Sequence, residues 1–329
     1  MSDEPSLHVD DALGIAVPEG RQPDEIALAG SRDGALWCAM RLSLASGESV
    51  LSVQRVSDGV AHRVDSASRL GGLALSGETL WIAYRDATGR AAIAGTDTRD
   101  GSVRIDRFDA REEPPRIALD ALHGDAVVWP MGADAVLPHG VRAIGFSIPA
   151  DAHDATLAIG GDAVAFVNDR FVEVVAATGT HRFDALSSRA RALSPAVTRV
   201  NGRWAAAWVS EDTGKLVLAR SIVDEPPARV AEVWCALTRP WASAPGLAGD
   251  ANGAWIAWRE ERGPRAGVYL RRLDSAMRQI GREVRVSDRA AIAAPGRVAM
   301  VATRETAVTI AWIETREGAR TAWVRTVRL

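Results

Sequence analysis

The sequence comprises 329 residues, of which 47% are hydrophobic and 25% are charged. These are ordinary proportions for a folded, water-soluble protein, and they exclude a wholly disordered chain. The 39 basic and 42 acidic residues leave a net charge of −3, so we expect no general attraction to nucleic acid or to an anionic membrane. No apolar run is long enough for a membrane helix and the N-terminus does not resemble a secretory signal, which favours a cytoplasmic location.

Seven segments along the chain share one pattern. Each opens with a proline or glycine and a short alanine-rich strand, followed by an apolar strand that carries a large residue. These large residues, called anchors below, are Met40, Tyr84, Trp129, Phe166, Trp208, Trp258 and Trp312. The intervals between them are 44, 45, 37, 42, 50 and 54 residues, close to the period of about 45 for four-stranded propeller blades.

This repeat predicts an all-β fold, a seven-bladed β-propeller of four-stranded antiparallel blades, formed as a single domain by residues 1–329. The third and fourth repeats are less regular, so six or eight blades remain as alternatives. In the third repeat we expect a turn at MGAD and outer strands from AVLPHG and VRAIGFSI. In the fourth we expect a tight turn at Asn168 and Asp169.

The two ends of the chain complement each other. The last repeat stops at its third strand, RTAWVRTVRL, whereas the N-terminal residues 1–22 include a strand-like run, LHVDDALGIAV, before the first repeat. We predict that this segment completes the last blade, which removes two exposed sheet edges. The stretch from Arg265 carries 13 arginines against six acids and the first 35 residues are acidic, so the ends either attract each other or form an interaction surface.

The anchor strands are apolar on both faces. In GAWIAWRE, Trp255 and Trp258 are three residues apart and therefore point to opposite sides of the sheet. Blades stacked around an axis bury both faces of their inner strands, as do the strands of some sandwiches, but seven evenly spaced copies favour the propeller. Glycines suited to hairpin turns follow five anchors, at Gly47, Gly89, Gly214, Gly263 and Gly318.

The default ligand face of a propeller carries the loops between the second and third strands and the loops that lead into the next blade. The candidate ligand-binding residues on this face are Arg85, Asp86, Asp212, Trp241, Arg259, Glu260, Glu314 and Arg316. Trp241 suits a stacking platform and a blade-packing plug equally well. The competing interpretation is that most of these charges are solvated hairpin residues.

No sequence motif indicates a cofactor or a metal site. The six histidines show no paired metal-ligand spacing, and Cys38 and Cys235 lie in apolar runs that favour buried free thiols. G-x-S-x-G, H-E-x-x-H and glycine-rich phosphate loops are all missing from the sequence. We therefore expect no cofactor.

SEDTG at residues 210–214 matches the start of an Asp-box, S-x-D-x-G, and W-x-A-W/Y-R runs recur in the repeats. On these residues the chain resembles the sialidase-like, BNR-type propeller superfamily. The resemblance implies the propeller fold, with Asp-boxes in the turn between third and fourth strands, although SEDTG follows a second strand. Sialidase activity would require a tyrosine nucleophile, an acidic partner and three arginines. The tyrosines Tyr84 and Tyr269 lie inside strands, so we expect core residues and no sialidase activity.

The sequence leaves two hypotheses for the function. The first is a non-catalytic binding or scaffold propeller that engages a protein or peptide partner through its loop-rich face. The alternative is a carbohydrate-active propeller, a lectin, glycoside hydrolase or lyase, that takes a small saccharide. A lectin propeller repeats its sugar contacts in every blade, whereas the candidate loop residues of this chain differ from repeat to repeat, which counts against a lectin. An enzyme would gather acidic residues at the mouth of the central channel, and Asp86, Glu260 and Glu314 are the candidates for this role.

Overall fold

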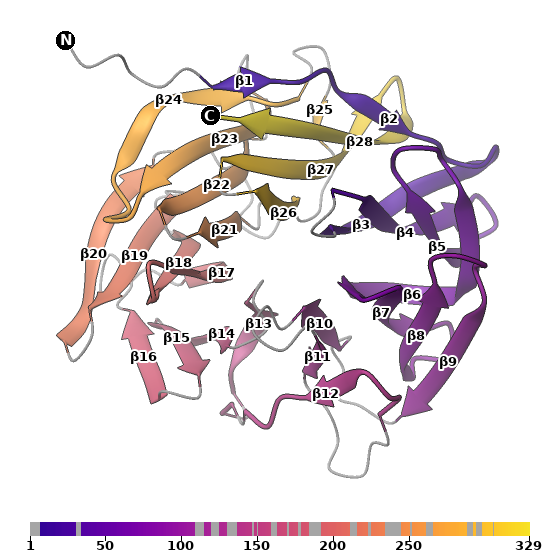
Figure 1. The fold of residues 1–329 in the computed structure, drawn as a ribbon, viewed down its shortest axis with the longest axis horizontal. Coiled ribbons are helices and arrows are strands. Elements are labelled where there is room, and N and C mark those ends of the chain that lie inside the picture. Colours follow the sequence, from indigo (N-terminus) through magenta and orange to yellow (C-terminus); the bar gives the residue numbers. More distant parts are fainter. Residues whose placement is uncertain are drawn as a thin grey trace.

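The structure is a computed structural model in which the described residues form sheets arranged in a ring (Figure 1). The described residues are 7–30, 34–108, 115–119, 125–129, 137–146, 148–149, 151–158, 163–169, 171–176, 179–183, 192–210, 216–222, 225–233, 245–250, 252–260, 266–287, 292–293, 298–304 and 306–329. They contain strands and turns but no helix, and hence no helix that meets the length and apolarity needed to cross a membrane. The all-β class and the propeller arrangement are confirmed.

The first part of the ring is one seven-stranded sheet in which each strand pairs with the next along the chain. Its strands are β3 (Arg21–Gly30), β4 (Leu36–Leu44), β5 (Ser49–Arg55), β6 (Ala61–Ser76), β7 (Thr79–Asp86), β8 (Ala91–Asp97) and β9 (Val103–Phe108). The first half of the 16-residue β6 pairs with β5 and its second half with β7. Two consecutive four-stranded meanders therefore share one continuous strand.

Three further sheets are four-stranded antiparallel meanders, each with at least one shift of register between paired strands. The first consists of β13 (His153–Leu157), β14 (Ala163–Asn168), β15 (Phe171–Ala176) and β16 (Gly179–Phe183). The second consists of β17 (Ala192–Val200), β18 (Arg203–Ser210), β19 (Leu216–Ile222) and β20 (Glu225–Val233). The third consists of β21 (Gly246–Asp250), β22 (Gly253–Glu260), β23 (Gly267–Asp274) and β24 (Gln279–Arg285). The tight turn expected at Asn168 and Asp169 is confirmed, since β14 ends at Asn168 and Asp169 adopts a φ of 53°.

The third repeat departs from the predicted antiparallel blade. Its described strands are β10 (Arg116–Leu119), β11 (Ala126–Trp129) and β12 (Val141–Ala143), and β12 pairs with β11 in parallel. The expectation of four antiparallel strands is therefore wrong for this sheet. The Trp129 indole donates to the carbonyl of Phe146 at 2.8 Å, which holds the chain after β12 against the sheet. The expected turn at MGAD lies outside the described residues.

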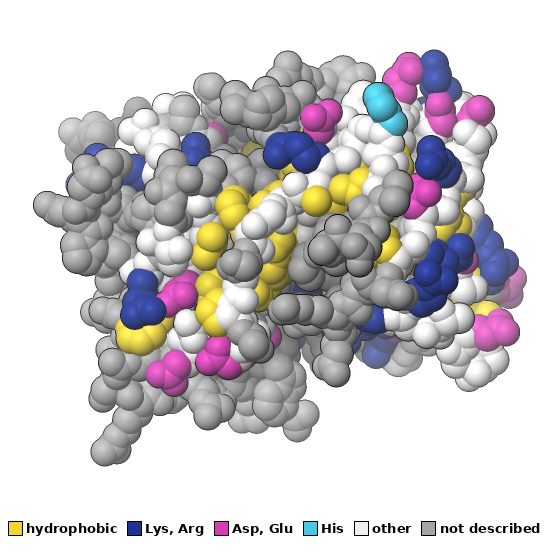
Figure 2. All heavy atoms as spheres, turned by 90° about the horizontal axis from the view of Figure 1, so that it is seen from below, with side chains coloured by type: hydrophobic (Ala, Val, Ile, Leu, Met, Phe, Trp, Pro, Cys, Tyr) yellow, Lys and Arg dark blue, Asp and Glu magenta, His cyan; other side chains and the backbone are white. Residues whose placement is uncertain are grey.

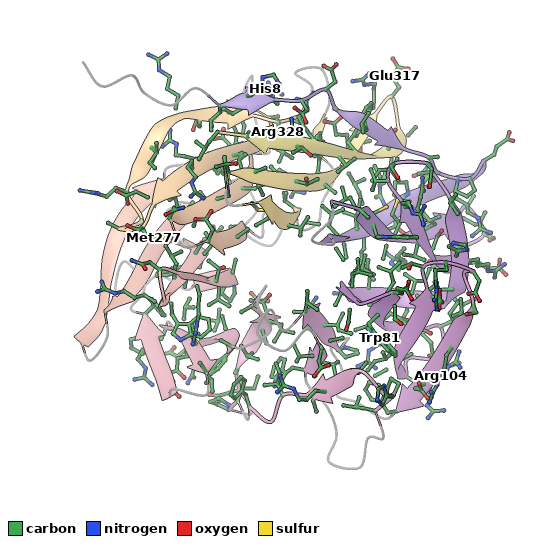
Figure 3. The ribbon with its side chains drawn as sticks, viewed as in Figure 1. His8, Trp81, Arg104, Met277, Glu317 and Arg328 are labelled. Atoms are coloured by element: carbon green, nitrogen blue, oxygen red, sulfur yellow. The ribbon has the colours of Figure 1, made fainter. Side chains whose placement is uncertain are left out.

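The two ends of the chain meet on one strand. The last sheet contains β25 (Ile292–Ala293), β26 (Ala299–Arg304), β27 (Ala307–Arg316) and β28 (Ala319–Arg328), and its outer strands are β1 (His8–Val9) and β2 (Leu13–Ile15). Both N-terminal strands pair antiparallel with β28, and His8 and Arg328 lie opposite each other there (Figure 3). Ion pairs join Arg328 to Asp10 and Arg320 to Asp24, so the two ends attract each other as the charge distribution suggested.

The second strand of each blade is buried on both faces, and β22 shows how. Trp258 packs in a cluster with residues of β17 and β18, whereas Trp255 packs in the cluster on the opposite side with residues of β26 to β28. Both side chains are at most 1% exposed. The prediction that these tryptophans point to opposite faces is confirmed, and each buried side chain contributes about 1.5–3 kcal/mol of hydrophobic stabilisation.

Glycines allow the inner strands of neighbouring blades to approach one another. A Cβ atom on Gly249 of β21 would lie 2.0 Å from the carbonyl oxygen of Arg199 on β17, and the Gly249 amide donates to Thr198 Oγ1 at 2.9 Å. Gly246 makes a similar approach to Met300 of β26, and Gly71 of β6 to Pro115 beside β10. At Gly249 and Gly71 the inner strands of neighbouring blades are thus packed backbone against backbone, and at Gly246 the backbone packs against a side chain.

We predict that Gly249→Ala destabilises the protein by about 1–3 kcal/mol, because the methyl group would collide with the Arg199 carbonyl and force the inner strands apart. The matched control is Gly145→Ala, where a Cβ meets no atom within 4 Å. Urea denaturation of both variants measures the effect. Equal stability of Gly249→Ala and wild type would show that the inner strands do not need this close approach.

Candidate functional site

One face of the ring carries the hairpins between second and third strands; we call it the site face. Neighbouring blades repeat the same up-and-down strand order, so their second strands end on this face. Its described hairpins follow β4, β7 and β27, and Gly47, Gly89 and Gly318 adopt positive φ in them, as predicted. Gly214 and Gly263 lie outside the described residues.

The structure buries most of the predicted ligand-binding residues that it describes. Asp86 is 5% exposed. Three further predicted residues are also buried, Arg259 and Glu260 at the end of β22 and Glu314 near the end of β27. Interpreting these four charges as solvated hairpin residues is therefore wrong, because the strands extend to them and neighbouring blades cover both faces. Arg85 is half-buried and donates to the carbonyl of Gly89, and Arg316 is exposed. Asp212 and Trp241 lie outside the described residues.

Two of the buried carboxylates accept hydrogen bonds from the anchor of their own strand. The Trp312 indole donates to Glu314 Oε1 at 2.8 Å, and the Trp258 indole donates to Glu260 Oε1 at 3.5 Å. Residues two apart on a strand share a face, so each glutamate reaches back along its strand to its anchor. In β18 the equivalent position is Ser210, and among the described residues the Trp208 indole nitrogen has no acceptor.

Asp86 fixes the hairpin after β7. Its Oδ1 accepts from the Thr88 amide at 2.9 Å, the Thr88 hydroxyl at 2.7 Å and the Arg90 amide at 3.0 Å, while Oδ2 accepts from Arg107 Nε at 3.0 Å. Burial opposes the charged form, but these donors outweigh it and hold the pKa of Asp86 below its usual value. Asp86 is therefore ionised and fully engaged at neutral pH.

Arg107 also joins the Asp86 hairpin to the preceding meander. Its Nη2 contacts Asp65 Oδ2 at 2.6 Å, and the same carboxylate oxygen accepts from the Tyr84 hydroxyl at 2.7 Å. Tyr84 is fully buried, and burial together with its bond to Asp65 raises its pKa well above the usual value. Tyr84 is thus a protonated core residue. Tyr269 is also a buried core residue, as predicted, and it stacks on Trp258 with ring centroids 5.8 Å apart.

A second polar network lies where the last sheet meets the first. Arg41 contacts Asp24 at 3.2 Å, Glu25 at 3.2 Å and Ser49 Oγ at 3.1 Å. Asp24 also pairs with Arg320 of β28, and Glu25 pairs with Arg69 at 3.3 Å. The Leu70 amide donates to Glu25 at 2.5 Å. These contacts link β28, β3, β4 and β6 across the closure of the ring.

Sequence reasoning missed the aspartates of the opposite face. In the hairpins between third and fourth strands, Asp58, Asp97 and Asp274 each accept backbone amides from residues two positions ahead. The signal in the sequence was an aspartate followed at once by a glycine, at Asp58 and, in the hairpin of Asp97, at Asp100, whereas the hairpin of Asp274 lacks this signal. SEDTG itself lies, apart from Ser210, outside the described residues.

The described residues contain no group of His, Cys, Asp or Glu side chains that would hold a metal ion. Acidic and basic side chains lie next to each other around a band of hydrophobic ones on the side of the ring shown in Figure 2. Acidic and basic side chains also lie next to each other on the site face, since each of its described networks combines carboxylates with arginines.

No family model and no curated protein matches the sequence. Among solved structures, the chain is similar to a protein of unknown function from Dyadobacter fermentans, with a TM-score of 0.58, 11% identity and coverage of 99% of this chain and 100% of that one. A chain of a mitotic checkpoint complex gives a TM-score of 0.52 and 12% identity over 96% and 93% of the two chains. Trypanosoma rangeli sialidase gives a TM-score of 0.50 and 10% identity, and the match covers 99% of this chain and 60% of the sialidase chain. These similarities show the fold alone, which is that of a β-propeller.

We predict that Cys38 resists alkylation in the native protein. It is a free, fully buried cysteine of β4, and burial raises its pKa to about 12, so the reactive thiolate is scarce at pH 8. Treatment with iodoacetamide at pH 8, with and without 8 M urea, followed by mass spectrometry of the Cys38 peptide, measures this. Rapid labelling without urea would contradict the burial of this thiol.

We predict that Asp86→Asn lowers stability at pH 7 by about 1–3 kcal/mol, because it weakens charge-assisted bonds to Arg107 and the hairpin amides. The folded-state pKa of Asp86 is lowered, so its contribution is complete at neutral pH and is lost as pH falls below about 5. The difference between wild type and variant in urea titrations should shrink between pH 7 and pH 3. A difference independent of pH would show that the carboxylate charge is not what stabilises the hairpin.

Proposed function

We propose that the protein is a non-catalytic binding propeller that engages a protein or peptide partner through the site face. The observation that carries the proposal is the burial of the candidate catalytic acids. Asp86 is bound by its own hairpin and by Arg107, and Glu260 and Glu314 accept from their neighbouring tryptophans. Acids held in this way order the strand ends of a rigid surface instead of converging on a substrate atom.

The tyrosine chemistry of a sialidase is not supported by the environment of Tyr84. Its hydroxyl is bonded to Asp65 and Arg107 lies beside it, but the residue is fully buried and its raised pKa keeps the phenol protonated. The three similar solved chains reported above are at most 12% identical to this one, so they support the fold alone and favour neither an enzyme nor a complex. The carbohydrate-active alternative is therefore an outcome to be tested.

We also propose that the ring has seven blades in one domain spanning residues 1–329, that residues 1–22 complete the last blade, and that the protein is cytoplasmic. The blade count is supported by the sheets: the seven-stranded sheet counts as two blades through the shared β6, three sheets are four-stranded meanders, and the sheets of β10–β12 and β25–β28 supply the remaining two. The closing role is supported by the pairing of β1 and β2 with β28.

The test compares the two faces of the ring. The site-face variant combines Glu48→Ala with Arg316→Ala, two exposed hairpin residues; the control combines Asp100→Ala with Arg278→Ala in exposed hairpins of the opposite face. Each tagged protein is used to capture binding partners from an extract of the native cells. We expect a stoichiometric protein partner that the control retains and the site-face variant loses at least in part.

Two outcomes would overturn the proposal. One is a partner lost equally from both variants or lost only from the opposite-face control. The other is retention of a saccharide, detected by mass spectrometry of the purified native protein and on a glycan array, with no protein partner. The second result would favour the carbohydrate-active alternative.

A further inference from the structure

Three arginines of the site face are exposed above carboxylates that lie deeper in the protein. The side chain of Arg69 is 61% exposed, that of Arg320 38% and that of Arg107 37%. The carboxylates they contact are less exposed, from 27% at Glu25 down to 7% at Asp86. We call these three residues the arginine patch. It spans β28, β6 and β9, which lie along the top and the right side of the ring in Figure 1.

The three arginines lie on one continuous polar surface. Arg320 and Arg69 are joined through Asp24, Arg41 and Glu25, each in direct contact with the next. Next to Arg69, the Ser68 hydroxyl donates to the Asp86 carbonyl at 2.8 Å, and Asp86 contacts Arg107. The patch therefore crosses the ring closure and the shared strand β6, the parts of the site face that the structure describes most fully.

The carboxylates beneath contact one or two nitrogens of each guanidinium and leave its other N–H groups unused. Arg69 uses Nε on Glu25, Arg320 uses Nη1 on Asp24, and Arg107 uses Nε and Nη2 on two aspartates. Among the described residues, the remaining N–H groups of these three side chains have no other acceptor. Arg107 is therefore held along one edge and presents its other edge as a preorganised fork suited to a carboxylate. Arg69 and Arg320 are each held at one nitrogen, and their remaining N–H groups can also donate to a carboxylate.

We propose that the arginine patch binds an acidic segment of the partner, a run of Asp or Glu side chains in a protein or peptide. This proposal rests on the proposed function and names the chemistry of its partner. Each carboxylate of such a run can accept from the remaining N–H groups of one arginine of the patch. The net charge of −3 gives no extended basic surface for a nucleic acid, which is why we propose an acidic protein segment as the ligand.

The experiment uses a fluorescein-labelled decaglutamate peptide as the probe and anisotropy at 50 mM NaCl as the readout. The test variant is Arg69→Gln with Arg320→Gln, which leaves Glu25 and Asp24 bound to Arg41. The matched control is Arg99→Gln with Arg278→Gln, two exposed arginines that also pair with aspartates but lie in hairpins of the opposite face. We expect the test variant to bind about five- to tenfold more weakly and the control to bind within about twofold of wild type.

Thermal melting of each variant shows whether it is folded. A further variant, Arg69→Lys with Arg320→Lys, tests whether the planar guanidinium is needed in addition to its charge. Because lysine keeps the charge but lacks the paired N–H groups, this variant should restore only part of the affinity. The proposal is overturned if wild type does not bind the peptide, if the control loses as much affinity as the test variant, or if a ten-nucleotide single-stranded DNA binds as tightly with the same arginine dependence. If the native partner remains bound to the test variant but not to the site-face variant, the proposed function stands and only this inference fails.

Discussion

The structure depends on one packing constraint: each blade must bury both faces of its second strand against its neighbours. The clusters around Trp258 and Trp255 lie on opposite sides of β22, so the core is a series of layers between blades. This requires the inner strands to meet closely, which is where Gly71, Gly246 and Gly249 lie. Side chains near the ends of the second strands fall within the same layers, and charges placed there become buried.

The repeat period was enough to predict the class of fold, because large residues recurring about every 45 positions are typical of four-stranded propeller blades. The interpretation of the four buried charges as solvated hairpin residues was wrong because the strands continue further along the sequence than their pattern indicated. β7 includes Asp86, β22 includes Glu260 and β27 continues to Arg316. The spacing Trp-x-Glu at Trp258 and Trp312 was the available signal, since it puts the glutamate on the buried face of its anchor. The direction of β12 had no such signal, because alternation of side chains is the same in parallel and antiparallel strands.

The composition of the chain, with a single lysine at Lys215 and 38 arginines, has a structural counterpart. Arg41 contacts three side chains at once, and Arg107 contacts two aspartates. The buried Arg272 forms two bonds to Asp250, at 2.7 and 3.0 Å, while its guanidinium lies 5.1 Å from the ring centroid of Trp255. A lysine offers neither the fork nor the flat surface for these arrangements. Arginine is therefore part of how polar groups are satisfied between the blades.

The pairing of the chain's two ends has a mechanical consequence. His8 lies opposite Arg328, and the pairs then continue inward from Val9 with Val327 to Ile15 with Ala322. A force that pulls the two ends apart is applied at the outer end of this short ladder. It loads the hydrogen bonds one after another, as in a zipper, instead of sharing the load among them as in shear. The closure of the ring is therefore weak against tension applied through its paired strands β1 and β28.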